Sequence, residues 1–433
     1  MRLFGSSGIR GIANVDVTPE LAMAVGRVLG SSYGSVIVGR DPRLTGEMLA
    51  SALIAGVLAS GADATDAGMV STPTLARGAK DYTCGVVITA SHNPAPYNGI
   101  KVWNPDGVAF DEAQQEEIEG ALERKSFSHA AWNKVGTRRV RADLAELHER
   151  SILEAVGHAT LKVVVDCGSG ATSEITPSVL KGMGCKVTAL NAQPDGHFPG
   201  RDPEPTEENL ELLRRTVRAL EADLGIAHDG DGDRMVAVDE KGQFVGGDKL
   251  LAVFAKREVK KAAVVPVDTS MAIDEMLPKA KVYRTRVGDV YVAQEVRRRK
   301  ADFGGEPSGT WMFPRVTMCP DGVYAAAHLV SIVKDTPLSE LVAQVPQFPI
   351  LRGAVPFPSG QRDEIVSRLD AALRGLPGKL ETVDGWRLGF EDGWFLVRLS
   401  GTEPKVRITA EARTEARAKE LYELALSKVT GAT

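Results

Sequence analysis

The sequence lacks any apolar run long enough to cross a membrane. A spanning helix needs about 18 or more consecutive apolar residues, and no stretch of the 433 residues approaches that length. Residues 1–7 also lack the apolar core of a secretory signal peptide. We therefore expect a cytoplasmic protein with no membrane partner.

Cysteine is scarce, and positive charge is not concentrated anywhere. The four cysteines are widely separated, which argues against a disulfide framework and against a zinc site, and we expect them to be buried in a reducing compartment: Cys84, Cys167, Cys185 and Cys319. The net charge is -5 and the basic residues are scattered, so no surface for nucleic acid is expected. An anionic partner must therefore be bound by a few nearby groups and not by a broad basic surface.

What the sequence does contain is a repeated pattern. A short β-branched run ending in aspartate occurs at residues 36–41, 163–166 and 264–268, and each run is followed by a helical pattern and further strand candidates. Alternating strands and helices imply right-handed βαβ units, in which ligands bind outside the carboxyl ends of the strands. Polar loops follow at residues 89–94, 229–234 and 304–309, and the last two contain glycine. The three loops should occupy equivalent places in three copies of one domain.

We predict an α/β fold with three related α/β domains, whose sheets are mixed and mainly parallel, and a C-terminal α+β domain. The last region differs because residues 386–412 are rich in aromatic and β-branched residues, with a turn signal at 391–393, before an amphipathic helix pattern at 414–429. The expected boundaries are 1–140, 141–245, 246–346 and 347–433. A Pro-rich stretch at 346–358 is the expected hinge before the last domain.

The loop at 229–234 carries three carboxylates at alternate positions, Asp229, Asp231 and Asp233. Intervening glycines allow a tight turn that directs the carboxylates to one point, as Mg²⁺ requires. An EF-hand calcium loop is a rival, because Glu240 falls at its twelfth position. Arg234 stands where that loop needs glycine, and a strand pattern follows, so Mg²⁺ is favoured.

The loop at 89–94 contains Ser91 and His92. Taken alone, Ser91 is typical of a turn, but a phosphate on it would complete the coordination of a nearby cation. Lys101 is then a candidate proton acceptor, because burial near a cation lowers the pKa of a lysine. His92 is expected in a supporting role at this site.

Three further segments carry groups suited to a phosphorylated sugar. Arg10 lies in a Gly/Ser loop fitted to an anion, and Glu306 and Ser308 offer an acceptor and a donor for sugar hydroxyls. The segment 398–407 offers hydroxyls, backbone N–H groups and two arginines, as a phosphate-binding loop does. Its candidate residues are Arg398, Ser400, Gly401, Thr402 and Arg407.

These motifs resemble the α-D-phosphohexomutase family, from residues 4–11 nearly to the end of the chain at 400–404. The resemblance implies four domains around a central cleft, a phosphoserine at Ser91, and Mg²⁺ held by Ser91 and the three aspartates. It implies that phosphate moves between O6 and O1 of a hexose through a bisphosphate. It also implies Lys101 as the general acid/base. We count His92, in its supporting role, and Arg10 with the predicted catalytic residues Ser91 and Lys101.

The same resemblance assigns the remaining contacts. Glu306 and Ser308 would bind the sugar, and the 398–407 segment, with Arg234, would bind the substrate. Residues 305–309 are most similar to phosphoglucosamine mutases of the archaeal type, which interconvert glucosamine 6-phosphate and glucosamine 1-phosphate. Two positions depart from the family: Thr310 stands where histidine is common, and Arg286 where lysine is common.

Other functions remain open at this stage. A phosphomannomutase/phosphoglucomutase would use the same machinery with another sugar. A metal-dependent sugar phosphatase would admit water to the phosphoserine, and a non-catalytic sugar-phosphate sensor would need no phosphoserine. We expect a monomer or homodimer that acts on a phosphorylated sugar.

Overall fold

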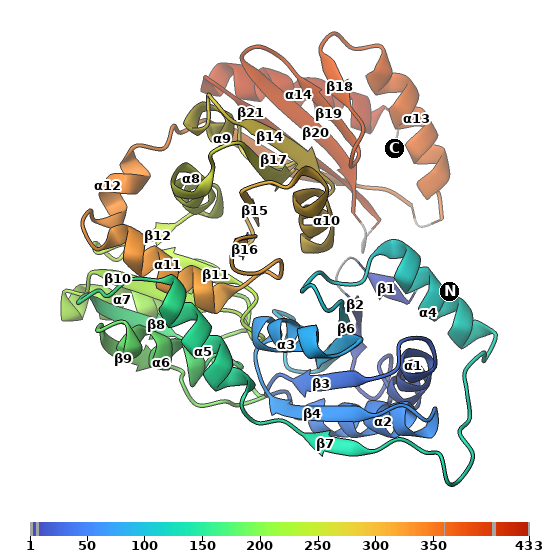
Figure 1. Ribbon diagram of the computed structural model, residues 1–433. Helices are drawn as coiled ribbons and strands as arrows, with labels where there is room; N and C mark the ends of the chain where they lie inside the picture. The colour runs from blue at the N-terminus through green and yellow to red at the C-terminus, as the bar shows by residue number, and fades with distance from the viewer. Residues whose placement is uncertain (1–2, 6–7, 359, 401–403, 432–433) are drawn as a thin grey trace.

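The computed structural model describes residues 3–5, 8–358, 360–400 and 404–431, and this part of the chain forms four β-sheets (Figure 1). The sheets follow one another around the molecule in chain order, from the blue N-terminal sheet through the green and olive sheets to the red C-terminal sheet. No helix among these residues is both long and apolar enough to cross a membrane.

The first three sheets share one arrangement of four strands, which confirms the repeat. In each, a first strand pairs in parallel with a strand on either side, and the third strand of the unit pairs with an antiparallel fourth. The equivalent strands are β3 (Val36–Arg40), β8 (Lys162–Asp166) and β13 (Ala262–Pro266); β4 (Ala64–Met69), β9 (Lys186–Leu190) and β14 (Lys281–Thr285); β5 (Cys84–Ile88), β10 (Leu224–His228) and β15 (Phe303–Glu306); and β6 (Tyr97–Trp103), β11 (Met235–Val238) and β16 (Thr310–Met312).

Short strands extend two of these sheets. β1 (Phe4–Gly5), β2 (Gly8–Ile12) and β7 (Arg138–Val140) lie at the edges of the first sheet, and β12 (Phe244–Val245) lies at one edge of the second. In the third sheet β15 runs as far as Glu306, so the loop expected at residues 304–309 begins only at Pro307. Glu306 therefore stands on a strand end and is held more rigidly than a loop residue.

Helices cover the first sheet on both faces, which explains its unbroken apolar strands. Val36 and Val38 of β3 pack against helices α1 (Pro19–Ser32) and α2 (Gly46–Ala59), whereas Ile37 packs against α3 (Thr72–Gly78) on the other face. The remaining helix of this unit is α4 (Glu112–Glu123), whereas α5 (Leu144–Ala155) opens the second unit and packs against α3.

The second and third sheets share one hydrophobic core. This core joins residues of β8 and β10 with residues of β13 and β15, and α11 (Gly322–Val333) lies within it. α11 follows the third sheet in the chain yet packs against the second, so the two units form one body. The other helices here are α6 (Ile175–Gly182), α7 (Glu211–Leu220), α8 (Gly247–Glu258), α9 (Ala272–Met276), α10 (Asp289–Arg299) and α12 (Leu338–Ala343).

The C-terminal sheet is antiparallel, as an α+β domain requires. Its strands, in sheet order, are β17 (Ile350–Pro356), β21 (Lys405–Ala412), β20 (Gly393–Leu399), β19 (Trp386–Gly389) and β18 (Lys379–Glu381). Helices α13 (Arg362–Arg374) and α14 (Glu415–Thr430) share one apolar core with these strands.

The expected hinge at 346–358 is wrong in its extent. β17 occupies residues 350–356 of that stretch and pairs with β21 along its whole length. The backbone hydrogen bonds of β17 therefore make it an edge strand of the C-terminal sheet. The connection that lies outside helices and strands is limited to residues 344–349.

Candidate functional site

The three aspartates that follow β10 converge on one point. Asp229, Asp231 and Asp233 are buried, and one oxygen of each lies within 4.8 Å of the others. The loop closes because Asp229 Oδ1 accepts hydrogen bonds from the backbone N–H groups of Gly232 and Arg234, both 3.1 Å away. Gly232 has a φ of 76°, a backbone conformation that residues with a side chain rarely adopt.

The charges of this cluster are only partly compensated. Burial, followed by repulsion from its two neighbours, raises the pKa of Asp229 well above the ordinary range. Burial also raises the pKa of Asp233, while Lys101 outweighs burial and lowers that of Asp231. One buried oxygen of Asp231 and one of Asp233 have no hydrogen-bond partner. Carboxylate oxygens left without partners in a buried cluster fit a hard divalent cation.

Glu240 does not belong to this cluster. Its carboxylate accepts hydrogen bonds from the backbone N–H and the hydroxyl of Ser339, at the start of α12. The EF-hand alternative, which needs Glu240 as a ligand, is therefore excluded.

Ser91 lies against the aspartate cluster. It follows β5 with a φ of 53°, and its hydroxyl donates to Asp229 Oδ2 at 2.7 Å. The backbone is left-handed there, a costly conformation for serine that the surroundings must enforce. The structure thus joins two motifs separated by 138 positions.

Arg43 enforces the shape of the serine loop, and the sequence reasoning missed it. Its buried guanidinium donates to four backbone carbonyl oxygens around the loop, those of Ser91, Asn93, Pro94 and Tyr97. Asp41 in turn accepts from Arg43 Nε at 3.0 Å. The available signal was an arginine two positions after the strand-ending aspartate.

Lys101 lies in β6 and faces the aspartates. Its ammonium donates to Asp231 Oδ2 at 2.8 Å and to Asp233 Oδ2 at 2.7 Å. Burial alone lowers the pKa of Lys101, but the two carboxylates outweigh burial and raise it above the ordinary range. The direction is opposite to the lowering expected from the sequence, because the two carboxylates outweigh both burial and the positive charge of Arg10.

His92, Arg10 and Arg234 surround the serine loop. Arg10 donates to the side-chain oxygen of Asn93 at 3.1 Å. Burial, followed by the charges of Arg234 and Arg10, lowers the pKa of His92 to about 2, so the imidazole is neutral. Glu204 links the group, since its carboxylate lies 3.3 Å from His92 and accepts from Arg234 at 2.7 Å.

Glu204 is a second residue that the sequence reasoning missed. It stands between two prolines, Pro203 and Pro205, in a loop of the second unit. Proline fixes the backbone on both sides of the carboxylate, and this was the one signal that could have marked it.

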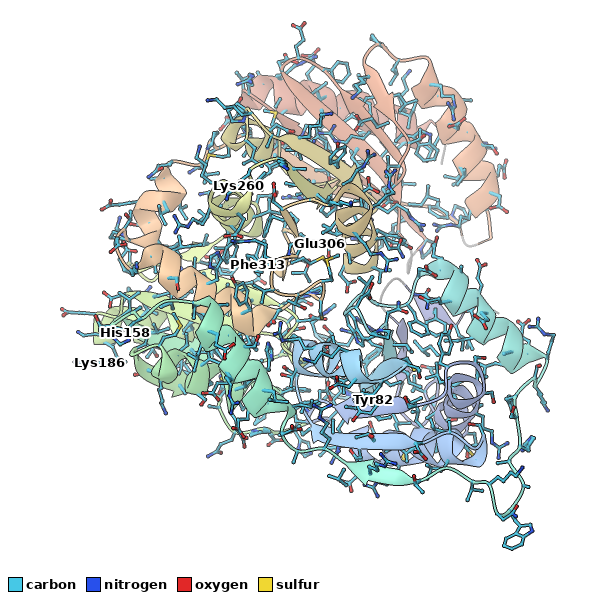
Figure 2. The ribbon with its side chains drawn as sticks, in the orientation of Figure 1. Tyr82, His158, Lys186, Lys260, Glu306 and Phe313 are labelled. Carbon is cyan, nitrogen blue, oxygen red and sulfur yellow. The ribbon has the colours of Figure 1, made fainter. Side chains whose placement is uncertain are left out.

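The third loop reaches the same region. Glu306, near the middle of the molecule in Figure 2, accepts from the N–H of Gly288 at 2.8 Å and from the hydroxyl of Thr310 at 3.0 Å. Burial, followed by the charge of Asp289, raises the pKa of Glu306 to about 7. Thr310 forms a β-bridge with Arg234 next to the aspartates, and Ser308 is exposed in the turn.

The C-terminal candidates lie where β20 ends and β21 begins. Arg398 donates to Asp384 at 2.9 Å, Ser400 is buried, and Arg407 is exposed on β21. These strand ends lie on the side of the sheet that faces α4 and β1 (Figure 1). Gly401 and Thr402 lie outside the residues that the structure describes.

Comparison with known protein families identifies the class of protein. The chain matches the phosphoglucomutase/phosphomannomutase α/β/α domains I, II and III over residues 1–129, 144–242 and 246–348, and the C-terminal domain over residues 360–426. The chain therefore belongs to the phosphoglucomutase/phosphomannomutase family, the α-D-phosphohexomutases. It is a phosphohexose mutase, an isomerase that transfers phosphate.

Individual relatives resemble the chain over its full length. A "probable phosphoglucosamine mutase" of Methanosarcina acetivorans is 54% identical over 428 residues, which are 98% of either chain. A phosphoglucomutase/phosphomannomutase family protein of Burkholderia thailandensis is 27% identical, with a TM-score of 0.90 over 100% of this chain and 97% of that one. The N-acetylphosphoglucosamine mutase of Aspergillus fumigatus, solved with GlcNAc-6P and magnesium, shares the fold at 15% identity, with a TM-score of 0.60 over 99% and 96%.

Proposed function

We propose that this enzyme interconverts glucosamine 6-phosphate and glucosamine 1-phosphate by way of a phosphoserine at Ser91 and a glucosamine bisphosphate. The observation that carries the proposal is the contact between the Ser91 hydroxyl and Asp229, 2.7 Å apart within the aspartate cluster. A phosphoryl group on Ser91 would lie beside three carboxylates that suit a divalent cation.

Each transfer exchanges one phosphorus–oxygen bond for another. A free hydroxyl of the sugar phosphate attacks the phosphorus of phosphoserine, the bond to Ser91 Oγ breaks, and the hydroxyl proton passes to a base. The bisphosphate then turns around and returns its other phosphoryl group to Ser91. The serine is phosphorylated again at the end of the cycle, and no water is consumed.

The aspartates and Ser91 are the proposed ligands of Mg²⁺. When bound, Mg²⁺ would neutralise charge that develops on the phosphoryl oxygens. Lys101 is the proposed proton-transfer residue, because its amino group lies beside the aspartates and next to the serine. With a cation bound by these carboxylates, the pKa of Lys101 would be lower and its amine could accept the proton. The neutral imidazole of His92, with Nδ1 3.4 Å from Ser91 Oγ, supports the serine loop together with Arg10.

Binding of the sugar phosphate is assigned to the other two loops. Glu306 and Ser308 would contact the sugar hydroxyls, and Arg398, Ser400, Gly401, Thr402 and Arg407 the phosphate that is not reacting, with Arg234 between them. The choice of glucosamine is supported by the relative at 54% identity, which is named a phosphoglucosamine mutase. The fold neighbour from Aspergillus fumigatus was solved with GlcNAc-6P and magnesium.

The mechanism is tested by mapping the phosphate. We expect peptide mass spectrometry of the purified enzyme to find phosphate on Ser91, and Ser91→Ala to lose both the phosphate and more than about 99% of turnover, since covalent transfer has no other acceptor. The exposed Ser126→Ala serves as the control. Normal turnover by Ser91→Ala would contradict the mechanism, as would full activity of the wild type in excess chelator.

The substrate is tested by comparing kcat/KM for glucosamine, glucose and mannose 6-phosphates under identical activation. A tenfold preference for glucose or mannose, about 1.4 kcal/mol in transition-state binding, would favour a phosphomannomutase/phosphoglucomutase instead. Release of inorganic phosphate would indicate a phosphatase, and binding without turnover a sensor.

A further inference from the structure

A buried histidine outside the site makes a hydrogen bond at each ring nitrogen. In His148, on α5, Nδ1 lies 2.8 Å from the hydroxyl of Thr74 and Nε2 lies 3.0 Å from Asp321 Oδ2. The side chain is 1% exposed. Each ring nitrogen therefore has one polar partner, a hydroxyl at Nδ1 and a carboxylate at Nε2. None of the proposed chemistry uses this residue.

On the Thr74 side of His148, hydrogen bonds connect α3 to the aspartate cluster. Thr72 is the first residue of α3, and its hydroxyl donates to Asp231 Oδ2 at 2.6 Å. The backbone N–H of Thr72 donates to the carbonyl oxygen of Asp231 at 2.8 Å. The first turn of α3 thus holds both the side chain and the backbone of a proposed metal ligand.

On the Asp321 side of His148, α11 contacts the same aspartate loop. Asp321 caps α11, because its Oδ1 accepts from the N–H of Tyr324 at 2.9 Å. The next residue, Gly322, donates from its N–H to the carbonyl oxygen of Gly232 at 3.2 Å. A β-carbon on Gly322 would lie 2.5 Å from the carbonyl oxygen of Arg234, so helix and loop are in direct contact.

We propose that His148 is a positioning residue for the metal site. It joins the first turns of α3 and α11, and each of these turns donates hydrogen bonds to the aspartate loop. The imidazole sets the distance between Thr74 and Asp321, and therefore between α3 and α11. Because both helices contact the aspartate loop, this distance determines whether the carboxylates of the loop converge. This inference rests on the metal-dependent function proposed above.

A cavity beside the histidine makes a chemical test possible. Thr74 and His148 line a hollow of about 410 Å³ together with Arg77, Leu144 and Ser151. In His148→Ala, free imidazole could enter through this hollow and again span the gap between Thr74 and Asp321. A residue that acts only by filling space would not be replaced by a hydrogen-bonding molecule in this selective way.

The experiment measures Mn²⁺ binding to the full chain by electron paramagnetic resonance, so that the readout does not depend on activity. Removing groups that orient metal ligands typically weakens metal binding by 10- to 100-fold, and we expect His148→Ala to raise the Kd for Mn²⁺ by about tenfold. Free imidazole, unlike toluene, should restore much of this loss. At saturating metal, the KM for the sugar phosphate should change by less than about twofold.

Matched variants separate positioning from folding. Thr74→Val removes the hydroxyl at nearly constant volume and should weaken Mn²⁺ binding as His148→Ala does, whereas Thr74→Ser should bind as the wild type does. His158→Ala, an exposed histidine at the edge of the molecule (Figure 2), is the control. If His148→Ala does not fold, Thr74→Val decides the question.

Two negative outcomes are distinguishable. Wild-type protein that binds no Mn²⁺ would overturn the proposed function and this inference with it. Wild-type protein that binds Mn²⁺, with folded His148→Ala and Thr74→Val binding it equally well, would overturn the role of His148 alone. Loss of binding in His148→Ala that toluene restores as well as imidazole would also overturn it.

Discussion

Single residues at the site differ in charge state because burial and neighbours act on them unequally. Asp231 is held in its ionised form by Lys101 and Thr72, while burial raises the pKa values of Asp229 and Asp233. Lys101 and Arg234 both act on the three carboxylates, but Arg234 is also paired with Glu204, and the pKa of Asp229 stays well above the ordinary range. The protein alone therefore does not compensate all the negative charge of the cluster, and this favours binding of a cation.

Glu306 should make folding stability depend on pH. Its pKa is about 7 in the folded protein, against an ordinary value of 4.5. A carboxyl with a raised pKa binds its proton more tightly when folded, so its contribution is present below pH 4.5 and is lost as the pH rises to about 7. We expect the free energy of unfolding to fall by about 3 kcal/mol over this window on account of Glu306.

Denaturant titrations of Glu306→Gln between pH 4 and 8 test this expectation, with ~0.5 pH-unit spacing. Glutamine keeps an oxygen for Gly288 and a polar group for Thr310, so the variant should lose most of this pH dependence while staying folded. Glu116→Gln, an exposed residue on α4, is the control. If the pH dependence of stability were the same in the variant and the wild type, folding would not raise the pKa of Glu306.

At the scale of elements, the site depends on close approach between two loops of different units. A β-carbon on Gly230 would lie 2.6 Å from the carbonyl oxygen of Ser91. Backbone atoms cannot yield as a flexible side chain can. The absence of a side chain at Gly230 therefore allows the serine loop after β5 and the aspartate loop after β10 to meet.

Gly230→Ala should separate these loops. Because a displacement of about 1 Å at reacting groups can cost 10²-fold, we expect kcat to fall by about that factor, with weaker Mn²⁺ binding and unchanged secondary structure by circular dichroism. Gly157→Ala, where the added carbon meets nothing within 4 Å, is the control. Wild-type kinetics of Gly230→Ala would show that the contact between loops is dispensable.

The connection between β20 and β21 should bind the phosphate that does not react. Losing one charged donor to a desolvated phosphate costs roughly 2–4 kcal/mol, so Arg407→Ala should lower kcat/KM by about 10²-fold while Ser91 stays phosphorylated. The measurement is steady-state kinetics together with intact-mass analysis. Arg368→Ala, exposed on α13, is the matched control. A normal kcat/KM for Arg407→Ala would show that β20 and β21 do not contribute to phosphate binding in this way.

At the scale of the whole molecule, a buried carboxylate joins the third unit to the C-terminal sheet. Glu411 of β21 accepts from the hydroxyl of Ser270 at 2.5 Å, from the N–H of Met271 at 2.7 Å and from the indole of Trp394 at 2.7 Å. Apolar side chains of Val267, Trp394 and Leu396 pack beside it. The proposed reorientation of a bisphosphate would require some opening of the molecule, and we expect this junction to limit opening between these two parts.

Glu411→Ala should loosen that junction. It leaves three donors without this partner, two of them buried, and each buried donor costs about 1–3 kcal/mol when it cannot reach water. We expect a lower free energy of unfolding, by at least about 2 kcal/mol, and faster cleavage within residues 344–349 in limited proteolysis. Glu423→Ala, exposed on α14, is the control. Unchanged proteolysis would place the restraint on opening elsewhere.

The sequence by itself determined the repeated units and the location of the candidate site. An apolar strand ending in aspartate is a local pattern, and the topology of parallel strands places the loops after β5 and β10, together with the end of β15, at equivalent positions. The alternating carboxylates of residues 229–233 likewise converge through local turns, because Gly232 supplies the left-handed backbone there. These features needed no knowledge of distant partners.

Only the tertiary structure decided which side chains meet. Lys101 contacts Asp231 and Asp233 across 130 and 132 positions, and the sign of its pKa shift follows from those neighbours. Arg43 and Glu204 are single polar residues whose importance lies in distant contacts. The pairing of β17 with β21 is equally non-local. Local periodicity specifies elements, whereas long-range packing selects the partners of each charged group, and therefore its protonation.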